Sequence, residues 1–244
     1  AGRVMEAKGP LSGVADEGGW WPNFASNEDA LDTLTKAIEA SGHRAGEEVF
    51  ISLDIAANEL GDASGYSLAL DEGQLTSEDM AARIVEWAGR YPILSIEDPA
   101  GQDDWTAMAA VTAAIGERVQ IIGDDVLVTN AARVERAGDA AVCNAALIKV
   151  NQVGTVTEAK AALDAAVARG WGAIVSARSG ESEDVTIAHL ATGWDAGQLK
   201  VGSFTRSERM AKWNEMLRIE EAMGADAEFA GFSAFAGSIG RVAA

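Results

Sequence analysis

The chain has 244 residues, of which 48% are hydrophobic and 23% charged, a size and composition typical of one large globular domain. Its net charge of −19 argues against a broad nucleic-acid or membrane surface, because both need clustered Lys and Arg. No apolar run approaches the roughly 18 residues that cross a bilayer, and Cys143 is the only cysteine, so no internal disulfide can form. These features favour a cytoplasmic protein.

Helical patterns and short apolar runs alternate along the chain. Asn27 is a predicted cap for a helix that Gly42 closes, and residues 77–89 predict a second helix with one apolar face. The tail 231–244, rich in Gly, Ala and Ser, is expected to be loose. Six apolar runs rich in β-branched residues predict strands at 49–53, 93–96, 119–122, 145–148, 172–175 and 198–201. This alternation predicts a parallel sheet with helical crossovers and strands buried on both faces.

Charged residues stand at or just beyond the end of each predicted strand. They are Asp54, Glu97, Asp98, Asp124, Asp125, Lys149, Arg178 and Lys200. In a (β/α) barrel the carboxyl ends of all strands converge on one face, where active sites lie. Any one of these charges has an ordinary interpretation as a helix cap or a solvated side chain, but six consecutive strands with a charge at this position predict a site.

The carboxylates and lysines of this series suit metal-assisted proton removal. Asp54, Glu97 and Asp124 would repel one another at close range unless a cation lay between them, and oxygen ligands without Cys or His favour Mg²⁺ or Mn²⁺ over zinc. Beside such a cation, Lys149 and Lys200 would have a lowered pKa, because a like charge disfavours the ammonium form. A neutral lysine is a competent base.

Two further segments complete this chemistry. Arg178, followed by Ser179 and Gly180, is typical of an anion clamp, since a guanidinium fork matches phosphate or carboxylate. Such a clamp would make the pocket cationic although the protein as a whole is acidic. The Asp-Glu-Gly-Gly stretch at 16–19 offers an acid that could help a leaving group depart, although alone it would usually be a solvated turn.

The sequence resembles the enolase family. The resemblance rests on eight ordered motifs that span nearly the whole chain, at 16–23, 53–59, 95–99, 123–125, 148–152, 176–181, 198–203 and 206–214. It implies an α/β fold, a TIM-like (β/α) barrel with six βα units, and identifies residues 1–244 as a partial C-terminal barrel domain. The family's N-terminal α+β domain and first two barrel strands would then be missing, and we expect the chain to be a fragment.

The resemblance also implies an activity and a set of roles. Enolases are lyases of glycolysis that interconvert 2-phosphoglycerate and phosphoenolpyruvate, and sites of this superfamily use a Lys or His base with one or two Mg²⁺ ions. A second Mg²⁺ would join with the substrate, and the longer protein would be a homodimer with a small phosphorylated substrate as its other partner. The roles implied are Mg²⁺ binding by Asp54, Glu97 and Asp124, proton removal from carbon 2 by Lys149, help to the leaving hydroxyl by Glu17, phosphate binding by Arg178 and Ser179, and carboxylate binding by Lys200.

The chain departs from the family pattern in its site. Ala177 stands where the family usually has His, and neither His43 nor His189 is placed by position to substitute. Trp20 and Trp21 are bulkier than the usual aromatic-small pair. Two alternatives therefore stay open: a paralogous lyase that acts on a related phosphorylated or phosphonylated hydroxy acid, and a non-catalytic scaffold. The second is disfavoured because the predicted metal, base and anion residues are all intact.

Overall fold

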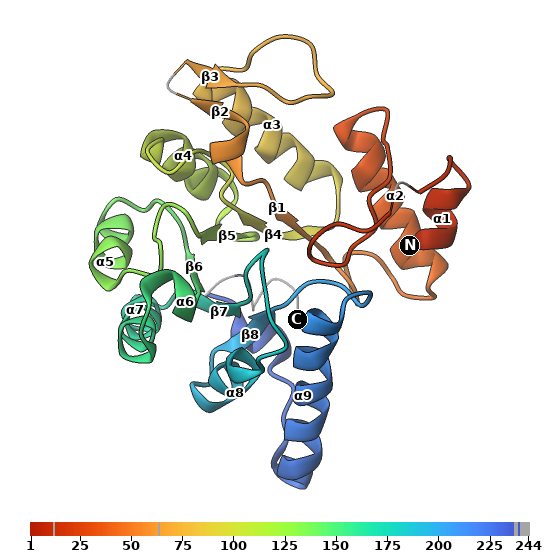
Figure 1. The fold of residues 1–244 in the computed structure, drawn as a ribbon. Helices are drawn as coiled ribbons and strands as arrows, with labels where there is room; N and C mark the ends of the chain where they lie inside the picture. Colours follow the sequence, from red (N-terminus) through yellow and green to blue (C-terminus); the bar gives the residue numbers. More distant parts are fainter. Residues whose placement is uncertain (12, 63, 237–238, 240–244) are drawn as a thin grey trace.

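The computed structural model describes residues 1–11, 13–62, 64–236 and 239, and its main feature is one curled sheet of six parallel strands (Figure 1). Neighbouring strands follow one another in chain order: β1 (Ile51–Asp54), β4 (Ile93–Glu97), β5 (Gln120–Gly123), β6 (Ala145–Ile148), β7 (Gly172–Ser176) and β8 (Gly197–Lys200). Among the described residues β1 and β8 are not paired with each other, so the sheet forms an incomplete barrel. The six predicted strands and the barrel class are confirmed.

Helices surround the sheet on its outer side (Figure 1). The crossovers contain α3 (Ser77–Arg90), α4 (Trp105–Ile115), α5 (Ala131–Asp139), the short α6 (Val150–Val153) with α7 (Val156–Ala168), and α8 (Thr186–Gly193). The chain begins with α1 (Gly2–Glu6) and α2 (Asn27–Ala40), and α9 (Ser207–Met223) follows β8. No helix among the described residues has the length and apolar character that crossing a membrane requires.

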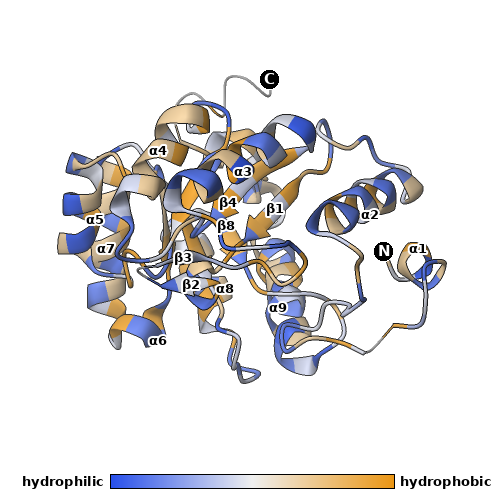
Figure 2. Ribbon diagram, turned by 90° about the horizontal axis from the view of Figure 1, so that it is seen from above, coloured by the Kyte–Doolittle hydropathy of each residue, from blue (hydrophilic) through white to orange (hydrophobic). Residues whose placement is uncertain are grey.

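The hydrophobic core has two parts, one on each side of the sheet. The larger part lies between the strands and the helices, whose apolar faces turn inward (Figure 2). The smaller part consists of Ile122, Ala145, Leu147 and Ile174 from β5, β6 and β7. Ala145 and Leu147 are two positions apart on one strand and so point to the same face, which identifies this cluster as the filling of the barrel. Burial on both faces explains the continuous apolar runs in the sequence.

The helix starts follow local capping chemistry. Thr76 caps α3 through a reciprocal capping box with Asp79. The cap of α2 was predicted wrongly as Asn27: Ser26 has the extended backbone of a cap, and its hydroxyl accepts the Asp29 N–H at 3.1 Å. Asn27 is the first helical residue. Because Ser and Asn have similar capping strengths, the sequence alone could not choose between the two neighbours.

Two segments differ from the expectation for the chain ends and loops. A hairpin of β2 (Gly61–Asp62) and β3 (Gly65–Tyr66) was not predicted. Within the tail, residues 231–234 form a 3₁₀ turn that contacts β8, where Gln198 Nε2 donates to the Ala234 carbonyl at 2.9 Å, and the rings of Phe50 and Phe232 lie 5.6 Å apart. The expectation of a loose tail is therefore wrong for 231–236, because aromatic and amide contacts hold it; residues 237–238 and 240–244 lie outside the described residues.

Candidate active site

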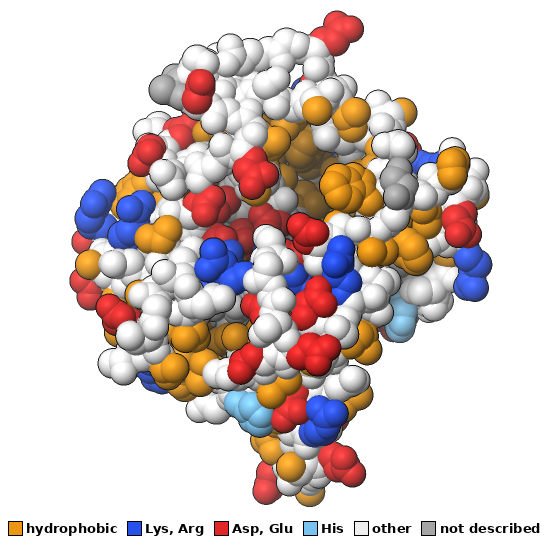
Figure 3. Space-filling model, in the orientation of Figure 1, with side chains coloured by type: hydrophobic (Ala, Val, Ile, Leu, Met, Phe, Trp, Pro, Cys, Tyr) orange, Lys and Arg blue, Asp and Glu red, His pale blue; other side chains and the backbone are white. Residues whose placement is uncertain are grey.

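The charged residues that end the strands meet in a hollow at the centre of one face. Figure 3 shows acidic and basic side chains side by side in this hollow. The register places Asp54 on β1 directly opposite Glu97 on β4, and Ser176 on β7 opposite Lys200 on β8, so the carboxyl ends of these strands are level. Parallel strands in such register bring side chains from distant parts of the sequence together.

Lys200 joins two of the three predicted metal ligands. Its Nζ lies 2.7 Å from Asp54 Oδ2 and 2.8 Å from Glu97 Oε2. The Glu97 side chain is 4% exposed, whereas that of Asp54 is 44% exposed. Burial raises the pKa of Glu97, the ammonium of Lys200 opposes that rise, and the nearby carboxylates Asp54 and Asp124 add to it.

Lys200 is protonated in this setting. Burial acts to lower its pKa, but the carboxylates of Glu97 and Asp54 outweigh burial and hold the pKa above the ordinary lysine value. The lowered pKa expected from the sequence concerned a lysine next to a bound cation, which is a different electrostatic environment. A protonated lysine at this position is suited to contact an anion rather than to accept a proton.

Lys149 and Asp124 form a second ion pair, between the ends of β6 and β5. Both side chains are nearly buried. Gln152 Nε2 donates to the other carboxylate oxygen, Asp124 Oδ1, at 3.2 Å, and Thr129 Oγ1 in turn donates to Gln152 Oε1 at 2.5 Å. The Lys149 backbone N–H donates to Thr129 Oγ1 at 3.0 Å. Side chain and backbone of Lys149 are thus fixed through one small network, to which Gln152 and Thr129 were not assigned from the sequence.

Asp98 sits one residue past β4 and holds the loop that carries Asp124. Its backbone is left-handed, with φ of +40°, and its side chain is buried. The carboxylate accepts the backbone N–H of Asp124 at 3.0 Å and that of Asp125 at 2.8 Å. Burial raises the pKa of Asp98 to about 7, although these two N–H groups favour the charged form. The Glu-Asp and Asp-Asp doublets were the only sequence signal for this arrangement.

Two groups of carboxylates that share Asp124 are candidates for holding a hard cation, one closely spaced in the structure and one predicted from the sequence. Oxygens of Asp98, Asp124 and Asp125 lie within 4.8 Å of one another. The set predicted from the sequence, Asp54, Glu97 and Asp124, comes from three neighbouring strands but is not brought together as closely in the described residues. Both groups fit Mg²⁺ in donor chemistry, since every ligand atom is a carboxylate oxygen. In the first group, however, Asp98 already accepts two N–H groups, and Asp125 Oδ2 accepts from Asn58 Nδ2 at 2.6 Å.

The predicted anion clamp lies on the loop after β7 and is tied to α9. Arg178 is half-buried and Ser179 is exposed. The Arg178 N–H donates to Glu181 Oε1 at 3.0 Å, and Glu181 Oε2 is 2.9 Å from the buried Lys212 Nζ. Arg209 donates to the carbonyls of Arg178 and Ser179, each at 2.7 Å. Neither α9 cation was assigned to the site from the sequence.

The predicted acid loop is docked beside the loop that follows β8. The Ser203 N–H donates to the Glu17 carbonyl at 2.7 Å, and Thr205 Oγ1 donates to the Gly18 carbonyl at 2.5 Å. Gly202 has φ of +120°, and a Cβ there would lie 2.7 Å from the Glu17 carbonyl oxygen. Only glycine permits this approach. The half-buried Glu17 is therefore held close in space to the end of β8, which carries Lys200.

A comparison with protein families assigns the chain to a family that matches this geometry. Residues 3–237 match the model of "Enolase, C-terminal TIM barrel domain". The chain belongs to the enolase family. The match covers the whole curled sheet and the loops at its carboxyl end, so the resemblance drawn from the eight motifs is confirmed.

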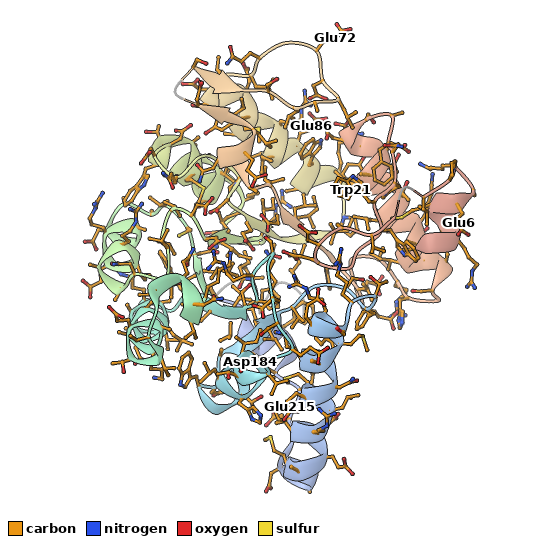
Figure 4. The ribbon with its side chains drawn as sticks, in the orientation of Figure 1. Glu6, Trp21, Glu72, Glu86, Asp184 and Glu215 are labelled. Carbon is orange, nitrogen blue, oxygen red and sulfur yellow. The ribbon has the colours of Figure 1, made fainter. Side chains whose placement is uncertain are left out.

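The structure locates the residues at which the chain departs from the usual enolase motif and the two histidines of the chain. Ala177 is buried, and its N–H donates to the Lys200 carbonyl at 2.9 Å, so this residue lies between the clamp and the end of β8. His189 Nε2 lies 2.9 Å from Glu215 Oε1 on α9, away from the hollow, and His43 is exposed in the loop after α2. Figure 4 shows Glu215 on α9, and it shows Trp21 on the N-terminal segment. Trp21 is 62% exposed, so most of its ring does not pack against the barrel.

Proposed function

We propose that this enolase domain carries the catalytic residues for dehydration of 2-phosphoglycerate to phosphoenolpyruvate, with Mg²⁺ as cofactor. The reaction belongs to glycolysis, and we propose a cytoplasmic homodimer as its setting. The observation that carries the proposal is the pattern of alternating charges in one hollow, in which Lys149 meets Asp124 and Lys200 meets Asp54 and Glu97. Membership of the enolase family supports the same conclusion.

The two lysines suit different tasks. Lys149 is nearly buried and positioned by Asp124 and by the Thr129–Gln152 network, so it can reach one proton at a defined position. A base must be neutral, and a cation bound at Asp124 would favour this by replacing the ammonium as counter-charge. We assign it removal of the proton from carbon 2. Lys200 is held protonated by its carboxylates, and we assign it contact with the substrate carboxylate.

The other roles follow from the loops that border the hollow. Arg178 and Ser179 would hold the phosphate, since a guanidinium fork and a hydroxyl both donate to its oxygens. Glu17 would protonate the departing 3-hydroxyl, and its loop is anchored next to the end of β8. The proton leaves carbon 2 to Lys149, the carbon–oxygen bond at carbon 3 breaks, and water departs with the proton from Glu17.

Mg²⁺, when bound, would supply the positive charge that stabilises the extra negative charge on the substrate carboxylate. We propose Asp54, Glu97 and Asp124 as its ligands, the set that the family resemblance implies. Their carboxylates pair with Lys200 and Lys149 in the structure, and a bound cation would replace these ammonium groups as counter-charge. Calorimetric titration of Glu97→Gln and Asp125→Asn with Mg²⁺ distinguishes the two carboxylate groups. A loss of affinity in Glu97→Gln alone supports the proposed set, whereas a loss confined to Asp125→Asn assigns the ion to the Asp98 group.

A second candidate function rests on Ala177. Ala177 places a buried methyl group where the family usually has an imidazole, which removes a hydrogen-bonding group, so the site would suit a related phosphorylated or phosphonylated hydroxy acid acted on by a paralogous lyase. If 2-phosphoglycerate is the substrate, Ala177→His should raise kcat/KM by about 10- to 150-fold, since a hydrogen bond to a charged group is worth about 1.5–3 kcal/mol. If another acid is the substrate, the added ring should crowd it and slow its turnover.

The deciding experiment is an absorbance assay of enol-pyruvate formation with the full polypeptide that the gene encodes. Wild type and Ala177→His are compared on 2-phosphoglycerate and on a panel of hydroxy-acid phosphates and phosphonates, with Mg²⁺. Turnover of 2-phosphoglycerate that depends on Mg²⁺ supports the proposal. No turnover of 2-phosphoglycerate by either form, while Mg²⁺ binds, would overturn it and favour the paralogous lyase.

A further inference from the structure

Two cations on the inner face of α9 are buried almost completely. Arg209 is 0% exposed and Lys212 is 1% exposed, and their spacing of three residues places them on one side of the helix. Lys212 is balanced by the carboxylate of Glu181. Arg209 forms no ion pair among the described residues, and its acceptors there are backbone carbonyls. A buried charge without a counter-charge costs stability, so its presence calls for a role beyond packing.

The carbonyls that Arg209 contacts belong to loops of the candidate site. Its guanidinium donates to the carbonyls of Arg178 and Ser179, each at 2.7 Å, and to that of Val201 at 2.9 Å. A longer contact of 3.4 Å reaches the Asp16 carbonyl, next to Glu17. One rigid, planar group thereby connects the anion clamp, the loop after β8 and the acid loop. Arg209 Nε is buried and has no hydrogen-bond partner among the described residues, so the contacts described there do not satisfy the whole guanidinium.

These contacts also set the direction of the backbone donors in the clamp. In a trans peptide the N–H points opposite to the C=O, so a carbonyl turned toward Arg209 turns the next N–H away from it. The Arg178 and Ser179 carbonyls face Arg209, and hence the N–H groups of Ser179 and Gly180 face away. Both residues are exposed, and neither N–H donates to another of the described residues. Two successive N–H groups that face the same side, without an acceptor among the described residues, can donate together to one anion.

We propose that Arg209 is a positioning residue that aims the Ser179 and Gly180 N–H groups at the phosphate of the substrate. The inference rests on the proposed function, because that function makes the 178–180 loop the phosphate site. Arg209 itself does not touch the substrate. Its guanidinium holds the loop in the orientation that binds an anion, and its uncompensated charge adds to the positive potential there.

The test compares Arg209→Lys and Arg209→Met with Arg218→Met, an exposed arginine of the same helix. Calorimetry on the full-length protein measures the affinity for inorganic phosphate and, in separate titrations, for Mg²⁺, and circular dichroism verifies folding. We expect phosphate affinity to fall about 10- to 100-fold in the Arg209 variants, as for other supporting residues around a site. Mg²⁺ affinity should stay within about twofold, because the carboxylates lie on other loops. Arg218→Met should match wild type.

Each outcome decides a separate question. Arg209→Lys keeps the charge and most of the volume but loses the planar fork, and it remains informative if Arg209→Met does not fold. Wild-type phosphate affinity in a folded Arg209→Lys variant would overturn the inference. Equal losses of phosphate and Mg²⁺ affinity, or a failure of both Arg209 variants to fold, would also overturn it, because these two results indicate a purely structural role. If wild type binds Mg²⁺ but not phosphate, the phosphate site itself, and with it the proposed function, is wrong.

Discussion

Replacing Lys200 with Met tests whether the hollow is held together by charge. The Nζ of Lys200 is 2.7 Å from Asp54 and 2.8 Å from the buried Glu97, and Met preserves most of the side-chain volume. Removing one partner of a buried pair costs about 3–5 kcal/mol, and the low end applies because the Lys200 side chain is 29% exposed. The pair with the half-exposed Asp54 adds at most about 1 kcal/mol.

The expected loss of about 3 kcal/mol corresponds to a fall in Tm of about 6–12 °C for a chain of this size. The loss should also depend on pH. The pKa of Glu97 is raised in the folded protein by burial, and removal of the ammonium raises it further. A group with a raised folded pKa contributes stability at low pH and loses it as pH rises through that folded pKa. Wild type and variant lose the same stability up to the wild-type Glu97 pKa of about 8, so the deficit of Lys200→Met should grow mainly as pH rises from about 8 to about 10.

Thermal unfolding of chelator-treated, full-length protein, followed by circular dichroism across this pH range, measures the effect. Lys160→Met is the matched control, because Lys160 pairs with Asp164 on the surface of α7 and both side chains are well exposed. We expect a cost below about 1 kcal/mol for the control. A Lys200→Met protein with the Tm of the control, or with a deficit that does not change with pH, would refute the reasoning.

Two further predictions concern buried groups around the site. Asp98→Asn replaces an oxygen that accepts a backbone N–H with an amide NH₂ group that can only donate. The free energy of unfolding, measured by urea denaturation, should fall by about 1–3 kcal/mol relative to the exposed control Asp103→Asn. Equal stability of the two variants would show that the turn needs no acceptor. Cys143 is 2% exposed, and burial raises the pKa of its thiol, so an aromatic disulfide reagent should label it only after denaturation. Rapid labelling of the native protein would contradict that burial.

The barrel strands and the charges at their ends could be predicted because both are local properties of the sequence. A strand buried on both faces needs an apolar run, and parallel topology alone places the residue after each run on one face. Asp54, Glu97 and Lys149 were found in this way. The hairpin at 61–66 was not, because two-residue strands leave no periodic signal.

Contacts that depend on the assembled fold could not be read from the sequence. Nothing local indicates that Lys200 would lie against Asp54, 146 positions away, or that Asp98 would accept two backbone N–H groups. Arg209 and Lys212 resemble ordinary charges of a surface helix, and their burial follows from the loops packed over α9. The order of the tail could not be predicted either, because the contact between Phe232 and Phe50 joins residues far apart in the sequence.

Exchange of the carbon-2 proton of 2-phosphoglycerate with deuterated water tests the proposed function most directly. With Mg²⁺ present, wild type should exchange this proton, and Lys149→Ala should lose exchange by at least the roughly 10²- to 10⁴-fold that a general base supplies. Glu17→Gln should slow loss of the hydroxyl yet keep exchange measurable, because proton removal precedes that step. If Lys149→Ala exchanges at the wild-type rate, Lys149 is not the base and the assignment of roles in the hollow is wrong.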